Sequence, residues 1–216
     1  MSKHILIVGA SRGIGLGLAK EFKARGWNVT GTERSESEEL HAIEGTQIET
    51  LDVTEPSTFD AIEGEFDAVI VNAGITGAKH QSSEQATAEE VAEVMMTNAF
   101  GPMHLGKKLL PRIRKGGSLS FMSSLMGSIA DSSGGYDLYR TSKTAQNMLA
   151  KGIAEQEAKE RGVTVLSLHP GWVQTDMGGP NAKITVEESA KGLADVVENA
   201  RGGYAFVDYT GKTLPF

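Results

Sequence analysis

Residues 8–19 read VGASRGIGLGLA. Gly9, Gly13 and Gly15 follow a short apolar run and open an amphipathic helical pattern. Glycines let the backbone turn tightly and approach a pyrophosphate, and a helix N-terminus offers free N–H groups and the positive end of a dipole. Between a first strand and a first helix, this G-x3-G-x-G spacing predicts a dinucleotide-binding loop. The alternative is a glycine-rich turn that binds no ligand.

Apolar, β-branched runs alternate with helical patterns along the rest of the chain. We expect strands at residues 4–8, 28–32, 47–51, 67–71, 118–122, 163–168 and 203–208. Helical patterns lie around residues 14–25, 37–43, 56–62, 87–114, 138–160 and 186–199. This alternation favours right-handed βαβ units, and several strands are apolar enough to be covered on both faces. The sequence predicts one α/β domain over residues 1–216, with a doubly wound, mostly parallel seven-stranded sheet and helices on both faces.

The composition is that of an ordinary globular protein, with 39% hydrophobic and 23% charged residues. The net charge of −7 argues against a general nucleic-acid or anionic-membrane binder, because both need a basic face. There are no cysteines, which excludes disulfides, thiolate zinc sites and cysteine nucleophiles and fits a reducing compartment. We therefore expect a cytoplasmic protein with no membrane segment, metal site or nucleic-acid partner.

Polar segments follow the predicted strands at their carboxyl ends. They read GASRGIG, TERS, LDVT, NAGITG, MSSLMGS and HPGWVQTDM. In a doubly wound sheet, ligands bind outside these ends of the strands. We expect the chemistry to lie there.

These segments resemble, in order, the motifs of the short-chain dehydrogenase/reductase family. GASRGIG is similar to its cofactor loop, VNAG to its N-A-G motif, and TNAFG to its helix asparagine motif. SS…YRTSK resembles its catalytic serine and Y-x-x-x-K, and HPGWVQTDM its P-G motif. The insert GSIADSSGGY and the ending DYTGKTLPF resemble C-factor-like and carbonyl-reductase-like members. The resemblance covers nearly the whole chain and implies a Rossmann fold, an NAD(P)-dependent oxidoreductase, and a homodimer or homotetramer formed through helices 87–114 and 138–160.

Two tyrosines after the fifth strand each have a cation four residues later, Arg140 after Tyr136 and Lys143 after Tyr139. A tyrosine can supply a proton to an alkoxide if a nearby cation lowers its pKa from about 10. Residues i and i+4 share a face only in a helix, and SSGGYD is typical of a loop with Asp137 as the N-cap of the next helix. With the family motif, this favours Tyr139 as acid/base and Lys143 as its pKa-lowering, ribose-binding partner. Tyr136 is expected at the substrate entrance.

Ser123 and Ser124 both end the fifth strand. Alternation indicates that one of them points into the site, but does not say which. The resemblance favours Ser124, the second of the pair, as the residue that binds the substrate oxygen. The segment from Ser124 to Tyr139 is longer than the family usually has, and Ser128 stays an alternative.

Asn98, within the helical pattern at residues 87–114, resembles the fourth catalytic residue of the family. Pro102 has no N–H to donate to the Asn98 carbonyl, so we expect a kink and a free carbonyl there. That carbonyl could hold a water that bridges to Lys143 in a proton relay. The alternative is an accidental kink.

The resemblance also implies contacts to a nicotinamide dinucleotide. Asp52 either binds the adenine edge or caps its turn, and Asn72 either binds the cofactor or supports the loop. The implied cofactor-binding residues are Gly9, Ser11, Arg12, Gly13, Ile14, Gly15, Glu33, Arg34, Asp52, Val53, Asn72, Ala73, Gly74, Tyr139, Lys143, Pro170, Gly171, Val173 and Thr175.

The choice between NAD and NADP depends on the segment TERS, which places Glu33 beside Arg34. A carboxylate there binds the free 2′-hydroxyl of NAD, whereas an arginine accepts the 2′-phosphate of NADP. Arg12 is a second cation, similar to those of NADP-preferring members. Two cations should outweigh one carboxylate that can swing away, so we expect NADP, with NAD as the alternative.

Together the motifs predict a carbonyl reductase or alcohol dehydrogenase that acts on a small carbonyl or alcohol substrate. The short segment GGPNAKI indicates an open site. The alternative function is a cofactor-binding sensor or signalling protein with little turnover, because C-factor-like members are associated with cell–cell signalling. Candidates for an apolar substrate wall are Met126, Ile129, Tyr136, Trp172 and Met177.

Overall fold

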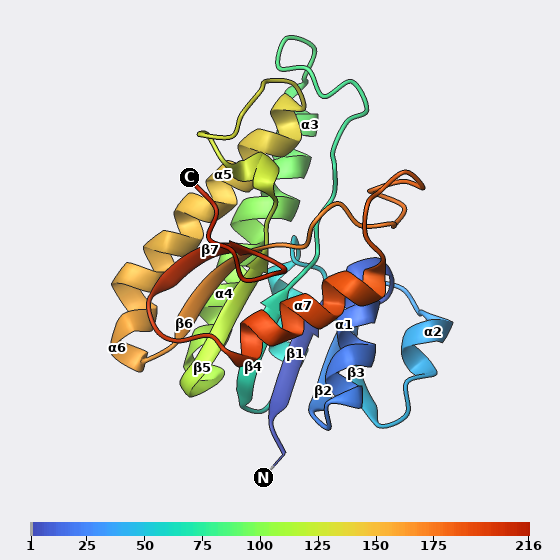
Figure 1. Cartoon of the computed structure of the whole chain (residues 1–216), viewed down its shortest axis with the longest axis vertical. Coiled ribbons are helices and arrows are strands. Elements are labelled where there is room, and N and C mark those ends of the chain that lie inside the picture. The colour runs from blue at the N-terminus through green and yellow to red at the C-terminus, as the bar shows by residue number, and fades with distance from the viewer. Residues whose placement is uncertain (1) are drawn as a thin grey trace.

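The computed structural model describes residues 2–216 and is built around one parallel sheet (Figure 1). Its strands run in the order β3-β2-β1-β4-β5-β6-β7, and each neighbouring pair is parallel. The strand order reverses between β1 and β4, which is where ligands bind in such sheets. The predicted doubly wound α/β sheet is confirmed. The strands are β1 (His4–Val8), β2 (Asn28–Glu33), β3 (Thr46–Thr50), β4 (Phe66–Val71), β5 (Ile113–Met122), β6 (Thr164–His169) and β7 (Tyr204–Asp208).

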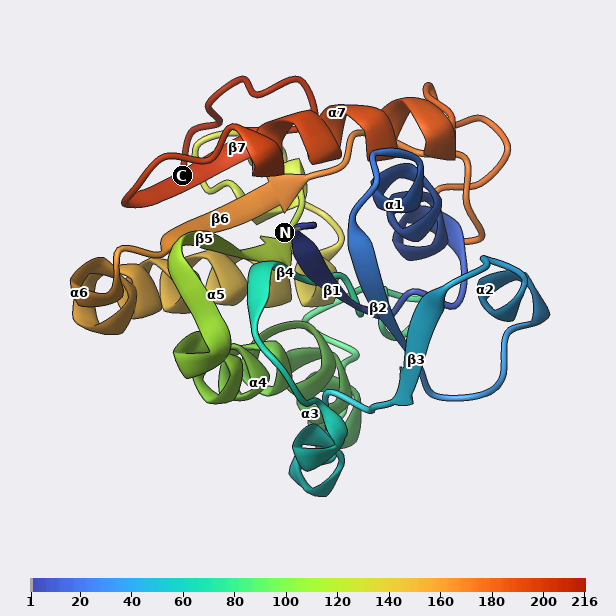
Figure 2. The same ribbon diagram turned by 90° about the horizontal axis from the view of Figure 1, so that it is seen from below.

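Helices cover both faces of this sheet (Figure 2). On one face α1 (Gly13–Ala24) packs against α7 (Val186–Glu198), and on the other lie α4 (Gly101–Leu109) and α5 (Asp137–Ile153). The shorter helices are α2 (Glu38–His41), α3 (Ala88–Met95) and α6 (Lys159–Arg161). Within residues 2–216, no helix has the length and apolar character needed to cross a membrane. The cytoplasmic location stays a prediction.

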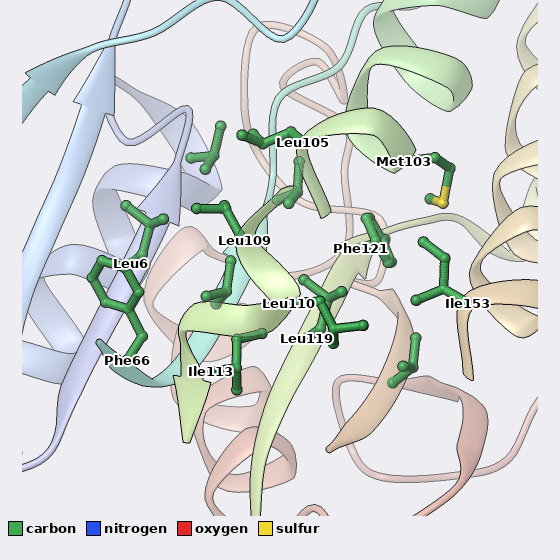
Figure 3. Close-up of a cluster of buried hydrophobic side chains, with 14 of the residues drawn as sticks. Leu6, Phe66, Met103, Leu105, Leu109, Leu110, Ile113, Leu119, Phe121 and Ile153 are labelled. Carbon is green, nitrogen blue, oxygen red and sulfur yellow. The ribbon is translucent and has the colours of Figure 1, made fainter. Parts of the chain in front are cut away.

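Alternate residues of β1 enter two different cores. Leu6 and Val8 join the cluster under α4 and α5, part of which is drawn in Figure 3. Ile5 and Ile7 join the cluster under α1 and α7. All four side chains are at most 1% exposed, and burying a side chain of this size stabilises the fold by about 1.5–3 kcal/mol. The sheet is therefore a rigid platform for the loops at its carboxyl edge.

Several predicted helices differ from the observed ones. The prediction of a helix to residue 114 is wrong, because α4 ends at Leu109 and β5 already begins at Ile113. Pro111 lies in the 3₁₀ turn Leu110–Arg112 between them, where a proline ends the α-helical hydrogen bonding. The pattern at 138–160 is divided by a π-helical turn at residues 154–158, the pattern at 56–62 forms a 3₁₀ helix, and the helix at 37–43 shortens to α2.

The interruption expected before Pro102 is a π-helical turn, Met96–Phe100, which joins α3 to α4. The N–H of Gly101 bonds to the carbonyl of Met96, five residues back. Pro102 is the second residue of α4, and because it has no N–H it cannot continue the helical hydrogen bonding of the π-helical turn before it. Asn98 is at the centre of this wider turn.

Candidate active site

A cavity of about 810 Å³ runs along the carboxyl edge of the sheet. Its volume lies in the range that holds small molecules and cofactors. It extends from the β2–α2 connection, past the loop between β1 and α1, to the first turns of α5. Among the predicted cofactor residues, those in its lining are Gly9, Ser11, Arg12, Gly13, Ile14, Glu33, Arg34, Asp52, Val53, Asn72, Ala73, Gly74, Tyr139, Lys143, Pro170 and Thr175.

Three predicted cofactor residues are not in this lining and instead shape the loops around it. A Cβ at Gly15 would lie 2.0 Å from the carbonyl oxygen of Gly9, so this glycine allows the loop to close on α1. Gly171 has a φ of +84°, and Val173 pairs with Ile184 in an isolated bridge. The latter two residues set the course of the chain after β6.

The glycine loop brings backbone to the cavity where side chains would block it. Gly9 has a φ of +81°, and a Cβ there would lie 3.0 Å from the backbone nitrogen of Ala73. Arg12, the N-cap of α1, makes no side-chain cap, so the first N–H groups of that helix are available to an anion. Asn72 donates its amide to the Gly9 carbonyl at 2.9 Å, which is the supporting role. This cradle fits the pyrophosphate of a dinucleotide.

At the far end of the cavity, the carboxylate of Glu33 is held from two sides. It is buried, and it accepts the Ser37 N–H at 2.8 Å and bonds Nε2 of His41 at 2.9 Å. The sequence drew attention to Glu33 and Arg34 but not to His41, which is eight residues away. Glu33 is therefore turned towards α2 in this structure.

The two arginines of the predicted 2′-phosphate site each have a carboxylate partner. Arg34 lies 3.5 Å from Asp52, and Arg12 pairs with Asp176, both on exposed guanidinium groups. Asp52 also accepts the N–H and hydroxyl of Thr54, so it caps its own turn as well as facing the cavity. Because both guanidinium groups are exposed, these ion pairs are weak, and a phosphate dianion could replace the carboxylate partners.

Tyr139 lies in the first turn of α5, and Tyr136 lies outside that helix. The predicted N-cap role of Asp137 is wrong, because α5 begins at Asp137 and Tyr136 is the N-cap, with a left-handed φ of 55°. The Asp137 carboxylate instead accepts the N–H and hydroxyl of Ser83. Arg140 donates to backbone carbonyls of the preceding loop. The two tyrosines thus differ in setting as well as in sequence position.

The two serines at the end of β5 point to different partners. Ser123 donates its hydroxyl to the Asn147 side chain at 2.6 Å, although it also borders the cavity. Ser124 lowers the pKa of Tyr139, which places it close to that phenol, and its hydroxyl oxygen accepts the N–H of Met126 at 3.2 Å. Ser128 is buried and accepts a backbone N–H within its own turn. Of the three, Ser124 is the one beside the tyrosine hydroxyl.

Lys143 is buried next to Tyr139, with its Nζ 5.7 Å from the centre of the tyrosine ring. Nζ donates to the Met122 carbonyl at 2.8 Å and to the side chain of Gln146 at 3.3 Å. Burial lowers the pKa of Lys143 to about 7. Burial also raises the pKa of Tyr139 to about 12, and the nearby Ser124 only partly offsets it. This direction is opposite to the predicted one, because desolvation of the phenolate is the largest effect on Tyr139.

Asn98 is fully buried and its side chain binds two segments. Its amide donates to the Ile75 carbonyl and the Ser142 hydroxyl, and its carbonyl accepts the Ile75 N–H at 2.8 Å. A Cβ at Gly74 would lie 3.1 Å from the Asn98 Oδ1 and 3.5 Å from Nζ of Lys143. The side chain therefore fixes the loop after β4 against α5, while the water relay from its backbone carbonyl stays a prediction.

Gln81 is a residue that sequence reasoning missed. It is buried, has a φ of 55°, and caps the N-terminus of α5 from another loop. Its backbone carbonyl accepts the N–H of Asp137 at 2.9 Å, and its side chain accepts the N–H of Tyr139 at 3.1 Å. Its amide donates to the carbonyls of Thr76 and Ala78. Figure 1 shows this loop, before α3, rising beside the N-terminal end of α5. No local signal identifies such a cap.

The predicted substrate wall is only partly at the cavity. Met177 lines it, while Met126, Ile129, Tyr136 and Trp172 do not. Apart from Met126, all of these side chains are exposed. Their role as a substrate wall stays a prediction.

Comparison with known proteins gives the family. The model of the short chain dehydrogenase family matches residues 3–184. The C-signal protein of Myxococcus xanthus is 37% identical over 158 residues, which are 71% of this chain and 94% of that protein. A short-chain dehydrogenase/reductase from Burkholderia multivorans, solved with bound NADP, is 36% identical with a TM-score of 0.94. A carbonyl reductase from Pseudomonas aeruginosa PAO1 in complex with NADP is 40% identical with a TM-score of 0.91.

Each of these two structural matches covers 100% of both chains. The resemblance read from the motifs is therefore confirmed, including its likeness to C-factor-like and carbonyl-reductase-like members. The family match extends from the first strand to beyond the P-G motif. This chain belongs to the short chain dehydrogenase family of oxidoreductases.

Proposed function

We propose that this protein is an NADP(H)-dependent carbonyl reductase or alcohol dehydrogenase that acts on a small carbonyl or alcohol. One observation carries the proposal: Tyr139 and the buried Lys143 line the same cavity as the glycine loop, and Ser124 lies close enough to Tyr139 to lower its pKa. The NADP found with the two structural relatives supports the choice of cofactor.

The chain's own residues would divide the work of binding. N–H groups of the glycine loop bind the pyrophosphate, and Arg12 and Arg34 leave their carboxylate partners for the 2′-phosphate. Lys143, whose Nζ donates to the Met122 carbonyl in this structure, donates to the ribose hydroxyls of the bound cofactor. When bound, the cofactor supplies the hydrogen and two electrons that reduce the substrate carbon.

Proton transfer falls to Tyr139. Its pKa of about 12 keeps the phenol protonated at neutral pH, so it can donate to a substrate oxygen that gains negative charge. Ser124 hydrogen-bonds the same oxygen and polarises the carbonyl. Lys143, with a pKa near 7, can take up a proton and so stabilise the phenolate that forms. In the direction of alcohol oxidation, the Tyr139 phenolate, stabilised by protonated Lys143, accepts the proton of the alcohol.

The direct test is turnover of NADPH with a panel of aldehydes, ketones and quinones, followed by the absorbance of the reduced nicotinamide. We expect at least one class to be reduced by the wild type and not by Tyr139→Phe. Consumption of NADPH at equal rates by both proteins would contradict the assigned chemistry.

A second candidate function is a cofactor-binding sensor or signalling protein. The observation that favours it is the 37% identity to the C-signal protein. Under this alternative, NADPH binds but no member of the substrate panel is turned over. Tyr139 and Lys143 in the lining of one cavity, with Ser124 close to Tyr139, support catalysis instead.

We also infer that the chain forms a homodimer or homotetramer through the helices at residues 88–109 and 137–153. Large apolar side chains are exposed on them and on the π-helical turn between α3 and α4, namely Val91, Met96, Phe100 and Met148. Light scattering should give a mass above 23.0 kDa for the wild type, and Phe100→Asp should lower it. Ile129→Asp, at an exposed apolar residue outside these helices, is the matched control.

A further inference from the structure

Both carboxylate oxygens of Glu33 are hydrogen-bonded to α2 or to its N-cap residue. Its side chain is only 8% exposed, and it lines the cavity at the end of β2. Ser37, which donates to Oε2, is the N-cap of α2, and His41, which bonds Oε1, is the last residue of that helix. Leu40 anchors the same helix in the core, and Figure 2 shows α2 at the edge of the sheet beside β3. The carboxylate is thus hydrogen-bonded to a short helix, and that helix is packed against the hydrophobic core through Leu40.

The orientation of this carboxylate matters because of what surrounds it. Arg12, Arg34, Ser35 and Glu36 line the same end of the cavity, where the adenosine 2′ group of a dinucleotide would lie. An uncompensated carboxylate repels a 2′-phosphate dianion, whereas it binds a free 2′-hydroxyl well. A side chain that controls Glu33 therefore controls the choice between the two cofactors.

We propose that His41 is a specificity-determining residue: by holding and neutralising the Glu33 carboxylate, it favours NADP(H) over NAD(H). The inference rests on the proposed function, because it assumes that this cavity binds a nicotinamide dinucleotide. His41 is not in the lining of the cavity and acts through Glu33, so it is a positioning residue. As an imidazolium it cancels the charge of Glu33; as a neutral imidazole it only donates a hydrogen bond.

The surroundings of His41 favour the imidazolium. The hydrogen bond with Glu33 raises the pKa of His41, and the charge of Glu36 adds to this. As pH rises through this raised pKa, His41 loses its proton and Glu33 loses its counter-charge. Binding of NADPH should then weaken relative to NADH. Further charged side chains on α2 and on the elements around it are Lys20 of α1, which pairs with Glu39, together with Arg34, Glu38 and Glu49.

The test measures dissociation constants of NADPH and NADH by calorimetry, for the wild type and His41→Ala, at about pH 6 and about pH 9. At the lower pH, His41→Ala should weaken NADPH by about fivefold, the upper end for a partly exposed ion pair. NADH should bind as well or better, because the released carboxylate can accept its 2′-hydroxyl. At the higher pH, the difference between the two proteins should shrink. The 2′-phosphate also titrates near pH 6, but it does so equally in both proteins.

Two further variants separate charge from position. His41→Gln keeps a hydrogen-bond donor without a charge, so at the lower pH it should behave as the wild type does at the higher pH. Glu33→Gln removes the charge that His41 controls, so adding His41→Ala to it should leave the NADPH-to-NADH ratio unchanged. Binding of NADH to each variant reports that the cavity is intact.

The inference is overturned if the NADPH-to-NADH ratio is the same in the wild type and His41→Ala at both pH values. It is equally overturned if His41→Ala shifts the ratio as much in the Glu33→Gln background as in the wild type. If neither dinucleotide binds the wild type, the proposed function itself fails, which is a different result from binding without a role for His41.

Discussion

The two ends of the cavity are built in different ways. At the glycine loop, neighbouring stretches of backbone approach each other closely, and the absence of side chains makes the site. At the proton-transfer end, Tyr139 and Lys143 are held by partners distant in the chain, among them Gln81 and Met122. Adding a side-chain atom should therefore disrupt the glycine loop. Removing a hydrogen-bond partner should disrupt the proton-transfer end.

The largest effect is expected from Gly15→Ala. Its new Cβ would lie 2.0 Å from the Gly9 carbonyl oxygen, which forces the loop to move. Overpacking of this kind costs about 1–3 kcal/mol or more in the free energy of unfolding, and NADPH binding should be lost. Gly152→Ala is the matched control, because a Cβ there meets nothing within 4 Å. Since alanine favours a helix over glycine, this substitution in α5 should raise the free energy of unfolding by up to about 1 kcal/mol. Urea unfolding and calorimetry check both, and normal NADPH binding by Gly15→Ala would contradict the steric account.

Tyr139→Phe should disable the other end of the cavity and leave the glycine loop intact. We expect kcat to fall about 10²- to 10⁴-fold, because the proton donor is lost, with the dissociation constant of NADPH nearly unchanged. Tyr136→Phe is the control, because Tyr136 is exposed and outside α5. A comparable loss of kcat in Tyr136→Phe would mean that the wrong tyrosine has been assigned.

Buried Lys143 should give the ligand-free protein a distinctive pH dependence. Its pKa falls from 10.5 to about 7, so between these values the unfolded chain binds more protons than the folded one. The free energy of unfolding should therefore rise with pH across this window, as the cost of burying the charge disappears. Above about pH 10 the raised pKa of Tyr139 acts in the opposite direction.

Lys143→Met isolates this contribution from other titrating groups. The variant should be more stable than the wild type at about pH 6, and this advantage should shrink towards about pH 10. Urea unfolding of both proteins across the range gives the difference. A pH-independent difference would show that the lysine is already charged and compensated in the fold.

The smallest effect is expected from Gln81→Ala. Removing the side chain leaves the N–H of Tyr139 without its cap, which costs about 1–2 kcal/mol of unfolding free energy. A frayed helix should also lower kcat more than it raises KM, because Tyr139 loses its alignment. Gln85→Ala, an exposed glutamine in the same loop, should change neither. Equal stabilities for the two variants would show that the Gln81 side chain does not stabilise the N-terminus of α5.

Much of the fold could be predicted from the sequence because its signals are local. Runs of apolar residues indicate the strands, and the glycines of residues 9–15 indicate where α1 begins. The polar segments after the strands indicate the edge of the sheet along which the cavity lies. The errors occurred where local signals compete. Helical periodicity continued through Pro111 into β5, and Asp137 matched an N-cap although the cap of α5 comes from Gln81, 56 residues earlier.

The sequence by itself therefore determined the order of the elements, the position of the glycine loop, and the helical spacing of Tyr139 and Lys143. Only the tertiary structure decided which serine faces the tyrosine, because Asn147 takes the hydroxyl of Ser123. It also reversed the expected pKa shift of Tyr139, since desolvation depends on what packs around a group and not on its neighbours in the chain. The same holds for Glu33, whose charge can be counted in the sequence but whose partner becomes visible only when α2 folds back on β2.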